Sequence, residues 1–421
     1  MNESPLLALV GLAVIALLAT RLPRPHWPRP ASLDLVLAAG GLAVLLGIVL
    51  GPGIDLLTPA MLRTLAPVTA LAIGWIGARL GAGFDWRYVR RVPRGVWLLA
   101  LVSSAATLLA VAVAAWFVAR LVPPLGLAWT PRLPAILALA AVAATSEPGA
   151  VARVAQAVGM RRRATRALGR VAALETACGA LAMTVPLALH RPHQPAGSPE
   201  LGWLSWIVFA VGSSALVGLM FVSFTRLRPA REDMSLALLA SLLFGAGIGY
   251  AAELSPFVVC ALAAALIVNL APRRHAVQRL LADGERPLSA VVLVIAGALL
   301  ALPTAWILAA VPLLAALRIA AMWASVRGGR VALQLPAWPR DAGLATVAQG
   351  AAATALGLNF FLVYGGPGAG SGRAVLTTVL LGVVVAQAAA PPLLRLGLRA
   401  APAPLTRAPV LPELSPNAPA D

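Results

Sequence analysis

Two carboxylic acids lie inside long apolar stretches of this sequence. Glu147 occurs in the run LALAAVAATSEPGAVARV, and Glu175 occurs in VAALETACGALAM among small and apolar residues. A charge inside a bilayer costs roughly 2.5–3.5 kcal/mol at mid-span and is usually retained for function. Apolar surroundings favour the protonated form of a carboxyl group, so either acid could carry a proton. These residues predict a site for a proton or an ion.

Pro148 directly follows Glu147 and predicts a break in the helix that contains both residues. A helix broken at membrane depth frees backbone carbonyls, which is tolerated where they line a cavity or bind an ion. Hard cations prefer oxygen ligands, and hydroxyls lie beside both acids. The predicted ion and proton ligands are therefore Glu175, Thr176, Glu147, Ser146 and Thr145. Alternatively, Glu175 forms a structural ion pair or stays protonated, and Glu147 stabilises the break or pairs with a loop arginine.

A second group of polar residues lies in later apolar stretches. Arg318 is expected to face the site and compensate the charge of Glu175, unless it reaches the cytoplasmic surface from the end of its span. Gln349 precedes Gly350, which predicts a second helix break, and is expected as a polar neighbour of the site. Asn359 is a further candidate neighbour, or it makes a hydrogen bond between helices.

These residues require a membrane scaffold to position them. Of the 421 residues, 60% are hydrophobic and 11% are charged, which is typical of an all-α polytopic membrane protein. Apolar runs of spanning length predict thirteen transmembrane helices, with a disordered, proline-rich cytoplasmic tail at 401–421. The predicted spans are about 5–20, 31–51, 64–80, 95–119, 133–152, 165–189, 201–225, 234–252, 255–271, 286–303, 304–325, 341–363 and 374–398.

The arginines set the expected orientation. The net charge is +18, and all 33 strongly basic residues are arginines. With the N-terminus outside, 27 of them face the cytoplasm and five face outward, while Arg318 is inside a span. We therefore expect a multi-pass protein of a bacterial-type cytoplasmic membrane, with the C-terminus in the cytoplasm. The positive charge reflects this topology and does not indicate nucleic-acid binding.

The two halves of the chain resemble each other weakly. LLGIVLGPG followed by LAPVTALAIGWIGARLG is similar to AALIVNLAP followed by RPLSAVVLVIAGALLAL, and the break at Ser146-Glu147-Pro148 is matched by Ala348-Gln349-Gly350. Both similarities are seven spans apart. An odd offset places the halves in opposite orientations, so the sequence predicts an inverted repeat, as in many secondary transporters.

The order and spacing of these segments resemble the monovalent cation/proton antiporters, in particular the Kef-like and Na+/H+ exchanger branches. GIVLGPGIDLL, TSEPGAVARVAQAVG, LSPFVVCALAAALIVNLAPRR and ATVAQGAAATALGL carry the resemblance, which covers roughly residues 35–395. The resemblance implies thirteen spans with two broken, crossing helices, and a homodimer. It also implies a transmembrane domain over 1–400, with a core at about 95–190 and 304–398, a dimerisation part at about 5–80 and 234–303, and a linker helix at about 201–225.

Two positions depart from the family pattern. Aligned through Gly179, the family's paired acidic site corresponds to Glu175-Thr176, so that Thr176 stands where an aspartate is usual. The position of a lysine in the family is occupied by Met322. These departures favour a transport-inactive relative that acts as a scaffold, sensor or partner subunit.

The expected function is exchange of H+ for Na+ or K+, with Glu175 as the shared ligand. The exchange is expected to be electroneutral, because the chain has no lysine and a guanidinium does not titrate in the accessible pH range. One alternative is a transport-inactive scaffold or sensor, and another is an organic-anion carrier in which Arg318 holds the anion. The sequence contains no pattern of an enzyme, a cofactor site or a metal site. His190 and His193 lack metal-ligand partners, and Cys178 and Cys260 fall in apolar spans as reduced thiols.

Overall fold

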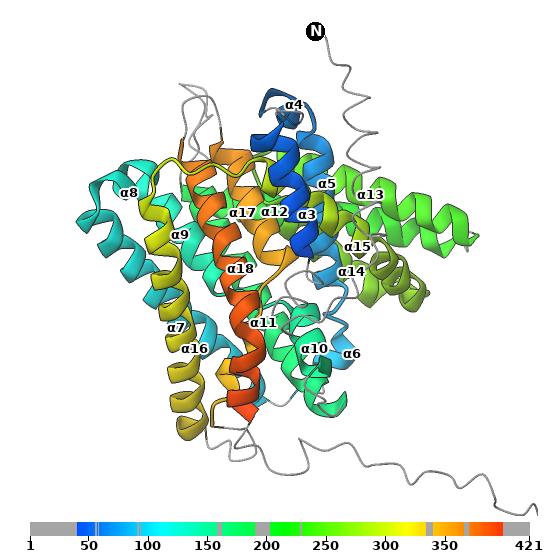
Figure 1. Ribbon diagram of the computed structural model, residues 1–421. Coiled ribbons are helices and arrows are strands. Elements are labelled where there is room, and N and C mark those ends of the chain that lie inside the picture. Colours follow the sequence, from blue (N-terminus) through cyan, green and yellow to red (C-terminus); the bar gives the residue numbers. More distant parts are fainter. Residues whose placement is uncertain are drawn as a thin grey trace, which may run out of the picture.

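The computed structural model describes residues 40–398, apart from 55–56, 58, 91, 93, 158–161, 190–202, 228–229, 334–339 and 366–369. Throughout this part the chain is helical, without strands (Figure 1). Seven of its helices are long and apolar enough to cross a membrane. The expectation of an all-α polytopic membrane protein is confirmed.

The helices follow the chain in a simple order. They are α3 (Leu42–Ile48), η2 (Val49–Gly53), α4 (Pro59–Thr64), α5 (Ala66–Gly81), α6 (Trp86–Val89), α7 (Arg94–Leu121), α8 (Pro123–Ala128), α9 (Arg132–Ala143), α10 (Pro148–Ala157), α11 (Arg162–Leu189), α12 (Trp203–Arg226), α13 (Arg231–Ala251), α14 (Pro256–Leu270), α15 (Arg274–Ala298), α16 (Trp306–Ala332), η3 (Ala342–Thr346), α17 (Ala351–Tyr364) and α18 (Gly370–Leu398).

Most predicted spans coincide with these helices. The predicted span 5–20 and the tail at 401–421 lie outside the described residues, as does the first part of the span 31–51. The predicted spans 133–152 and 341–363 are each divided, into α9 and α10 and into η3 and α17. Helix α15 begins twelve residues before the predicted 286, because its polar first turns bury Val277 and Leu281 on one face. A hydropathy pattern detects the apolar part of such a helix and misses its polar extension.

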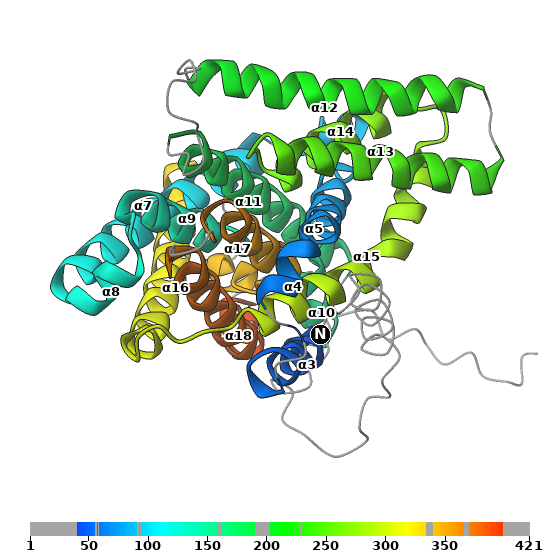
Figure 2. The ribbon, with the colours of Figure 1, turned by 90° about the horizontal axis from the view of Figure 1, so that it is seen from above.

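One group of helices packs around α5. This helix contacts α13, α14 and α15, while α3 packs on α15 and α12 lies against α13 and α14 along one edge (Figure 2). Glycines allow α5 to approach α14 closely: a Cβ at Gly77 would lie 2.1 Å from the carbonyl oxygen of Phe257, and one at Gly81 only 1.9 Å from that of Ala261. The glycine residues on this face of α5 therefore set the distance between α5 and α14.

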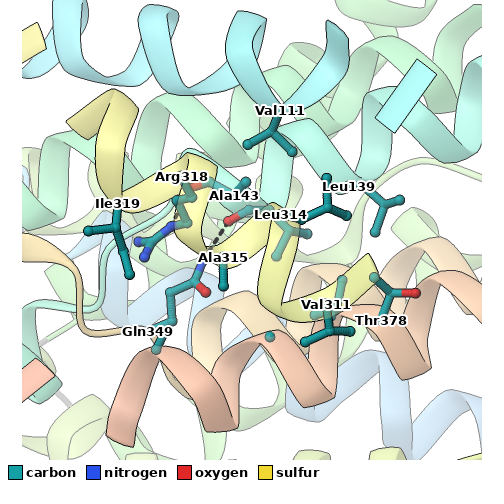
Figure 3. Close-up of a pocket in the computed structure, with 14 residues that line it drawn as sticks. Val111, Leu139, Ala143, Val311, Leu314, Ala315, Arg318, Ile319, Gln349 and Thr378 are labelled. Carbon is teal, nitrogen blue, oxygen red and sulfur yellow. Dashed lines mark hydrogen bonds between the residues drawn. The ribbon is translucent and has the colours of Figure 1, made fainter. Parts of the chain in front are cut away.

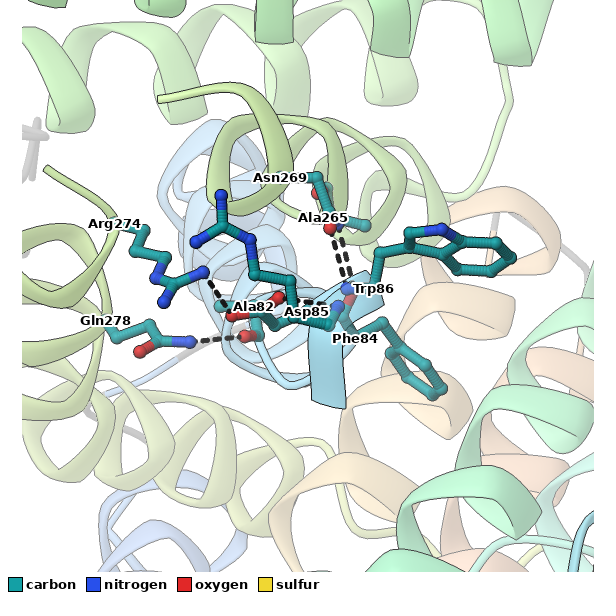
Figure 4. Close-up of polar contacts among 9 residues, drawn as sticks. Ala82, Phe84, Asp85, Trp86, Ala265, Asn269, Arg274 and Gln278 are labelled. Carbon is teal, nitrogen blue, oxygen red and sulfur yellow. Dashed lines mark hydrogen bonds and ion pairs between the residues drawn. The ribbon is translucent and has the colours of Figure 1, made fainter. Parts of the chain in front are cut away.

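Polar contacts close one end of this group, where α5 leads into α6 (Figure 4). Asp85 pairs with Arg274 of α15 at 3.2 Å. The Asn269 side chain accepts from the Trp86 N–H at 2.7 Å and donates to the Phe84 carbonyl at 2.9 Å. These contacts connect the end of α5 with α14 and α15.

The second group contains α7, α9, α10, α11, α16, η3 and α18, and α17 contacts both groups. Helix α9 packs on α7 and α11, and α16 packs on α7, η3 and α18. The division into core, linker and dimerisation parts and the inverted repeat stay predictions.

The contact of α5 with α14 predicts a strong effect of one methyl group. Gly81→Ala should lower the free energy of unfolding by about 1–3 kcal/mol, because the new Cβ collides with backbone that cannot rotate away. The measurement is the thermal unfolding midpoint of the purified protein in detergent. Gly212→Ala in α12 is the matched control, since nothing lies within 4 Å of a Cβ there. Equal midpoints for the two variants would contradict the proposed packing.

Candidate ion site at the crossing of two broken helices

The two breaks predicted from the sequence meet in space. Helix α9 ends at Ala143 and α10 begins at Pro148, whereas η3 ends at Thr346 and α17 begins at Ala351. The Glu147 N–H donates to the Ala348 carbonyl across the crossing, at 3.0 Å. Two non-helical segments therefore lie against each other within the second helix group. Their backbone groups must find partners outside a regular helix.

Arg318 of α16 supplies three of these partners. Its Nε donates to the Ala143 carbonyl at 2.7 Å, and its Nη1 and Nη2 donate to those of Val347 at 2.7 Å and Thr145 at 2.8 Å. The residue is 4% exposed, so it faces the site and does not reach the surface. No ion pair joins it to Glu175. The guanidinium is placed against the carbonyls of both breaks, and its positive charge acts on the Glu175 carboxyl group from beyond ion-pair distance.

Amide and hydroxyl side chains satisfy most of the remaining carbonyls. Gln349 donates to the Val142 carbonyl at 2.9 Å and to that of Thr145 at 3.3 Å, and the Gln387 side chain donates to the Gln349 carbonyl. The Thr176 hydroxyl lies within bonding distance of the Ala172 carbonyl at 2.8 Å and of the Ser146 carbonyl. The sequence did not single out Gln387, which lies within the apolar run of α18.

Glu147 is half-buried and lies at the start of α17. Its carboxylate accepts from the Ala352 N–H at 3.2 Å, at the end of the helix where the dipole favours negative charge. A Cβ at Gly350 would lie 2.4 Å from Glu147 Oε2, so a side chain at this position would force the carboxylate to move. Pro148 begins α10, in the helix position that does not need an N–H. Both helix-break residues therefore lie at the crossing.

Glu175 lies on α11 and is completely buried. The hydroxyls of Ser103, Ser146 and Thr346 face its carboxyl group, but neither carboxyl oxygen has a partner at hydrogen-bonding geometry. Ser103 was missed by the sequence reasoning, although two adjacent serines in an apolar span were a usable signal. A carboxylate in this environment is costly unless a proton or a cation neutralises it.

Asn359 and Met322 are two further positions considered from the sequence. Asn359 donates to the Ser255 hydroxyl at 3.1 Å, so it bonds between α17 and the start of α14, as the second interpretation held. Met322 is buried beside η3, where a Cβ on Gly343 would lie 2.3 Å from the Met322 carbonyl oxygen. Neither residue contributes a polar group to the surroundings of Glu175.

A small cavity lies on the other side of Arg318 (Figure 3). Its volume of about 50 Å³ is enough for one or two water molecules, at roughly 30 Å³ for each. Arg318, Gln349 and Thr378 contribute its polar groups. Its apolar walls include Val111, Leu139, Val311, Leu314 and Val379. Glu175 does not line this cavity, so the cavity leads to the capped carbonyls and not to the buried acid.

Metal-type clusters are not found in the described part of the chain, where no three His, Cys, Asp or Glu side chains gather. Cys178 and Cys260 are free thiols. His190 and His193 lie outside the described residues.

An all-helical membrane bundle with two broken helices crossing inside it defines a fold class, that of the sodium/proton antiporters. The chain is similar to the sodium proton antiporter MjNhaP1 from Methanocaldococcus jannaschii at pH 8, with a TM-score of 0.66, 14% identity, and coverage of 94% of this chain and 99% of that one. For an electron-microscopy structure of MjNhaP1 the TM-score is 0.62 and the identity 15%, with 93% and 96% covered. No known family's sequence profile and no curated protein matches the sequence. The expected fold is therefore confirmed by structure.

The three hydrogen bonds of Arg318 predict that a lysine cannot replace it. Arg318→Lys retains the charge but loses the planar arrangement of donors, so at least one buried carbonyl is left without a partner. We expect a loss of about 2–4 kcal/mol in the free energy of unfolding, seen as a lower thermal midpoint in detergent. Arg327→Lys on the same helix is the control, because its side chain is 53% exposed and should tolerate the change. Similar midpoints for both variants would show that the carbonyls do not need the guanidinium.

Proposed function

We propose that this protein exchanges protons for a monovalent cation, Na+ or K+, across a membrane, with Glu175 as the shared ligand. The supporting observation is the completely buried carboxyl group that lacks a hydrogen-bond partner beside the helix crossing. The fold adds support, because MjNhaP1 is a sodium proton antiporter. In this proposal the cytoplasmic membrane is the site of action, with the N-terminus outside and the protein a homodimer.

One carboxyl group is sufficient to couple the two fluxes. Glu175 is neutral when it holds a proton, and its charge is compensated when it holds a cation. The empty carboxylate is disfavoured, because complete burial removes water from the charge and neither carboxyl oxygen has a hydrogen bond of normal geometry to replace it. If the site opens to the other side of the membrane only while Glu175 holds a proton or a cation, each cation that crosses is exchanged for a proton. No further component is needed for this coupling.

The surrounding residues divide into ligands and supports in this proposal. Ser146 offers a side-chain oxygen beside Glu175, while the Thr145 and Thr176 hydroxyls already donate to backbone carbonyls and can still accept a cation through their oxygen lone pairs. Arg318 and Gln349 maintain the shape of the crossing through their bonds to carbonyls. Glu147 stabilises the start of α17.

A second candidate is a transport-inactive protein with the same fold. The specific observation in its favour is that protein donors occupy the carbonyls that a broken helix otherwise offers to an ion. An organic-anion carrier is less well supported, because three of the five N–H groups of Arg318 are already used by those carbonyls. Cation-dependent proton flux separates the antiporter from both.

Glu175→Gln should abolish cation-dependent proton flux in inside-out vesicles, measured with a pH-sensitive dye and additions of Na+, K+ or Li+. The variant should remain folded, because a neutral amide replaces an acid whose neutral form the site already tolerates. Glu147→Gln is the comparison and should mainly raise the KM for the cation. Wild-type flux from Glu175→Gln, or a larger loss from Glu147→Gln, would reverse the assigned roles.

Exchange should not respond to membrane potential. If Glu175 is the only group in the path that changes protonation, one H+ is exchanged for one monovalent cation and no net charge moves. A potential imposed with valinomycin on K+-loaded proteoliposomes should therefore leave Na+/H+ exchange unchanged. Liposomes with the same K+ gradient but no valinomycin control for transport of K+ itself. Exchange that depends on potential would indicate a second titrating group, with Glu147 as the first to test.

A further inference from the structure

Four unpaired oxygen atoms gather where α7, the α9–α10 break and α11 meet. They are Ser103 Oγ, Ser146 Oγ and the two carboxyl oxygens of Glu175: both hydroxyls lie beside the carboxyl group, but none of the four atoms makes a hydrogen bond of normal geometry. All three residues are 1% exposed or less. The Thr346 hydroxyl of η3 also faces the carboxyl group. Oxygens from separate segments of the chain thus converge on one buried point.

Local backbone bonding does not explain these hydroxyls. Nearby hydroxyls in the same helices bond back to carbonyls one turn earlier, as Thr107 does to Ser103 at 2.8 Å and Thr176 does to Ala172 at 2.8 Å. Ser103 and Ser146 do not, and a buried polar group without a partner costs stability. A proton on Glu175 would satisfy one of the four oxygens, whereas a cation among them could contact all four.

We propose that Ser103 is a cation ligand, and that Ser103, Ser146 and Glu175 together form a side-chain site for a small hard cation, Na+ or Li+ rather than K+. This rests on the proposed function and specifies its substrate. Oxygen atoms are the ligands that hard cations prefer. Most carbonyls of the two breaks already have donors from Arg318, Gln349 and Gln387, so side-chain oxygens remain. Few ligands in a closed space favour a small ion over a large one.

The test is cation binding to the purified protein in detergent, measured by calorimetry at pH 8.5 without transport. Wild type should bind Na+ and Li+ more tightly than K+. Ser103→Ala should raise the Kd for Na+ roughly tenfold, because one ligand is lost. Ser104→Ala is the matched control on the same helix: its hydroxyl is also buried and unpaired but faces Cys178, so the Kd should stay within about twofold of wild type.

A second pair of variants protects the test against misfolding. Ser103→Thr retains a hydroxyl and should bind Na+ nearly as wild type does. Ser103→Cys keeps the size but replaces the oxygen with a soft sulfur, which suits Na+ poorly, and should bind as weakly as Ser103→Ala. An unchanged Kd in both Ser103→Ala and Ser103→Cys would overturn the proposal, as would wild-type protein that binds no Na+. Equal binding of K+ and Na+ would overturn the preference for small cations.

Flux measurements separate this site from the proposed antiport. If the wild-type protein binds Na+ through Ser103 but shows no cation-dependent proton flux, the cation site is supported and the proposed antiport is refuted. If the wild-type protein exchanges Na+ for H+ and the Ser103→Ala variant has the same KM for Na+, the antiport is supported and the ligand role of Ser103 is refuted.

Discussion

The hydrogen bonds from Arg318 to three backbone carbonyls are the interaction on which the rest of this structure depends. A helix that breaks inside a membrane has no water to satisfy its free carbonyls. Here one guanidinium reaches both breaks and holds them at a fixed distance. Because it carries a permanent charge, the support does not change with pH. The bond from the Glu147 N–H to the Ala348 carbonyl is a second link between the same two breaks.

This arrangement separates backbone support from ion chemistry. Gln349 and Gln387 complete the satisfaction of the carbonyls, and Glu147 is held by the start of α17. Glu175 is then the one acid at the crossing whose carboxyl oxygens both lack partners in the described part of the chain. An exchange site made of side chains on a rigid crossing can lose or gain its ligand without weakening the fold, because the backbone bonds are made by other groups.

The helices and both breaks were predictable from the sequence, but the partners of the polar residues were not. The runs around Pro148 and Gly350 are long enough to span and contain one helix-breaking feature each. By contrast, Arg318 bonds to Ala143, 175 positions earlier in the chain, and no local pattern encodes that contact. Ser103 escaped notice because a serine in a membrane helix usually bonds to its own backbone. The sequence also suggested free carbonyls at the breaks, whereas most of them have protein donors.

Glu147 and Gly350 constrain each other's evolution. The carboxylate occupies the space that any side chain at position 350 would need, since a Cβ there would lie 2.4 Å from Glu147 Oε2. A mutation that adds a side chain at 350 is therefore harmful as long as a long acid remains at 147. Shortening residue 147 first would open the route, at the cost of its bond to α17. The order in which the two positions can change follows from this contact, so relatives with a side chain at position 350 should also have a shorter residue at position 147, whereas Gly350 can accompany either kind of residue at 147.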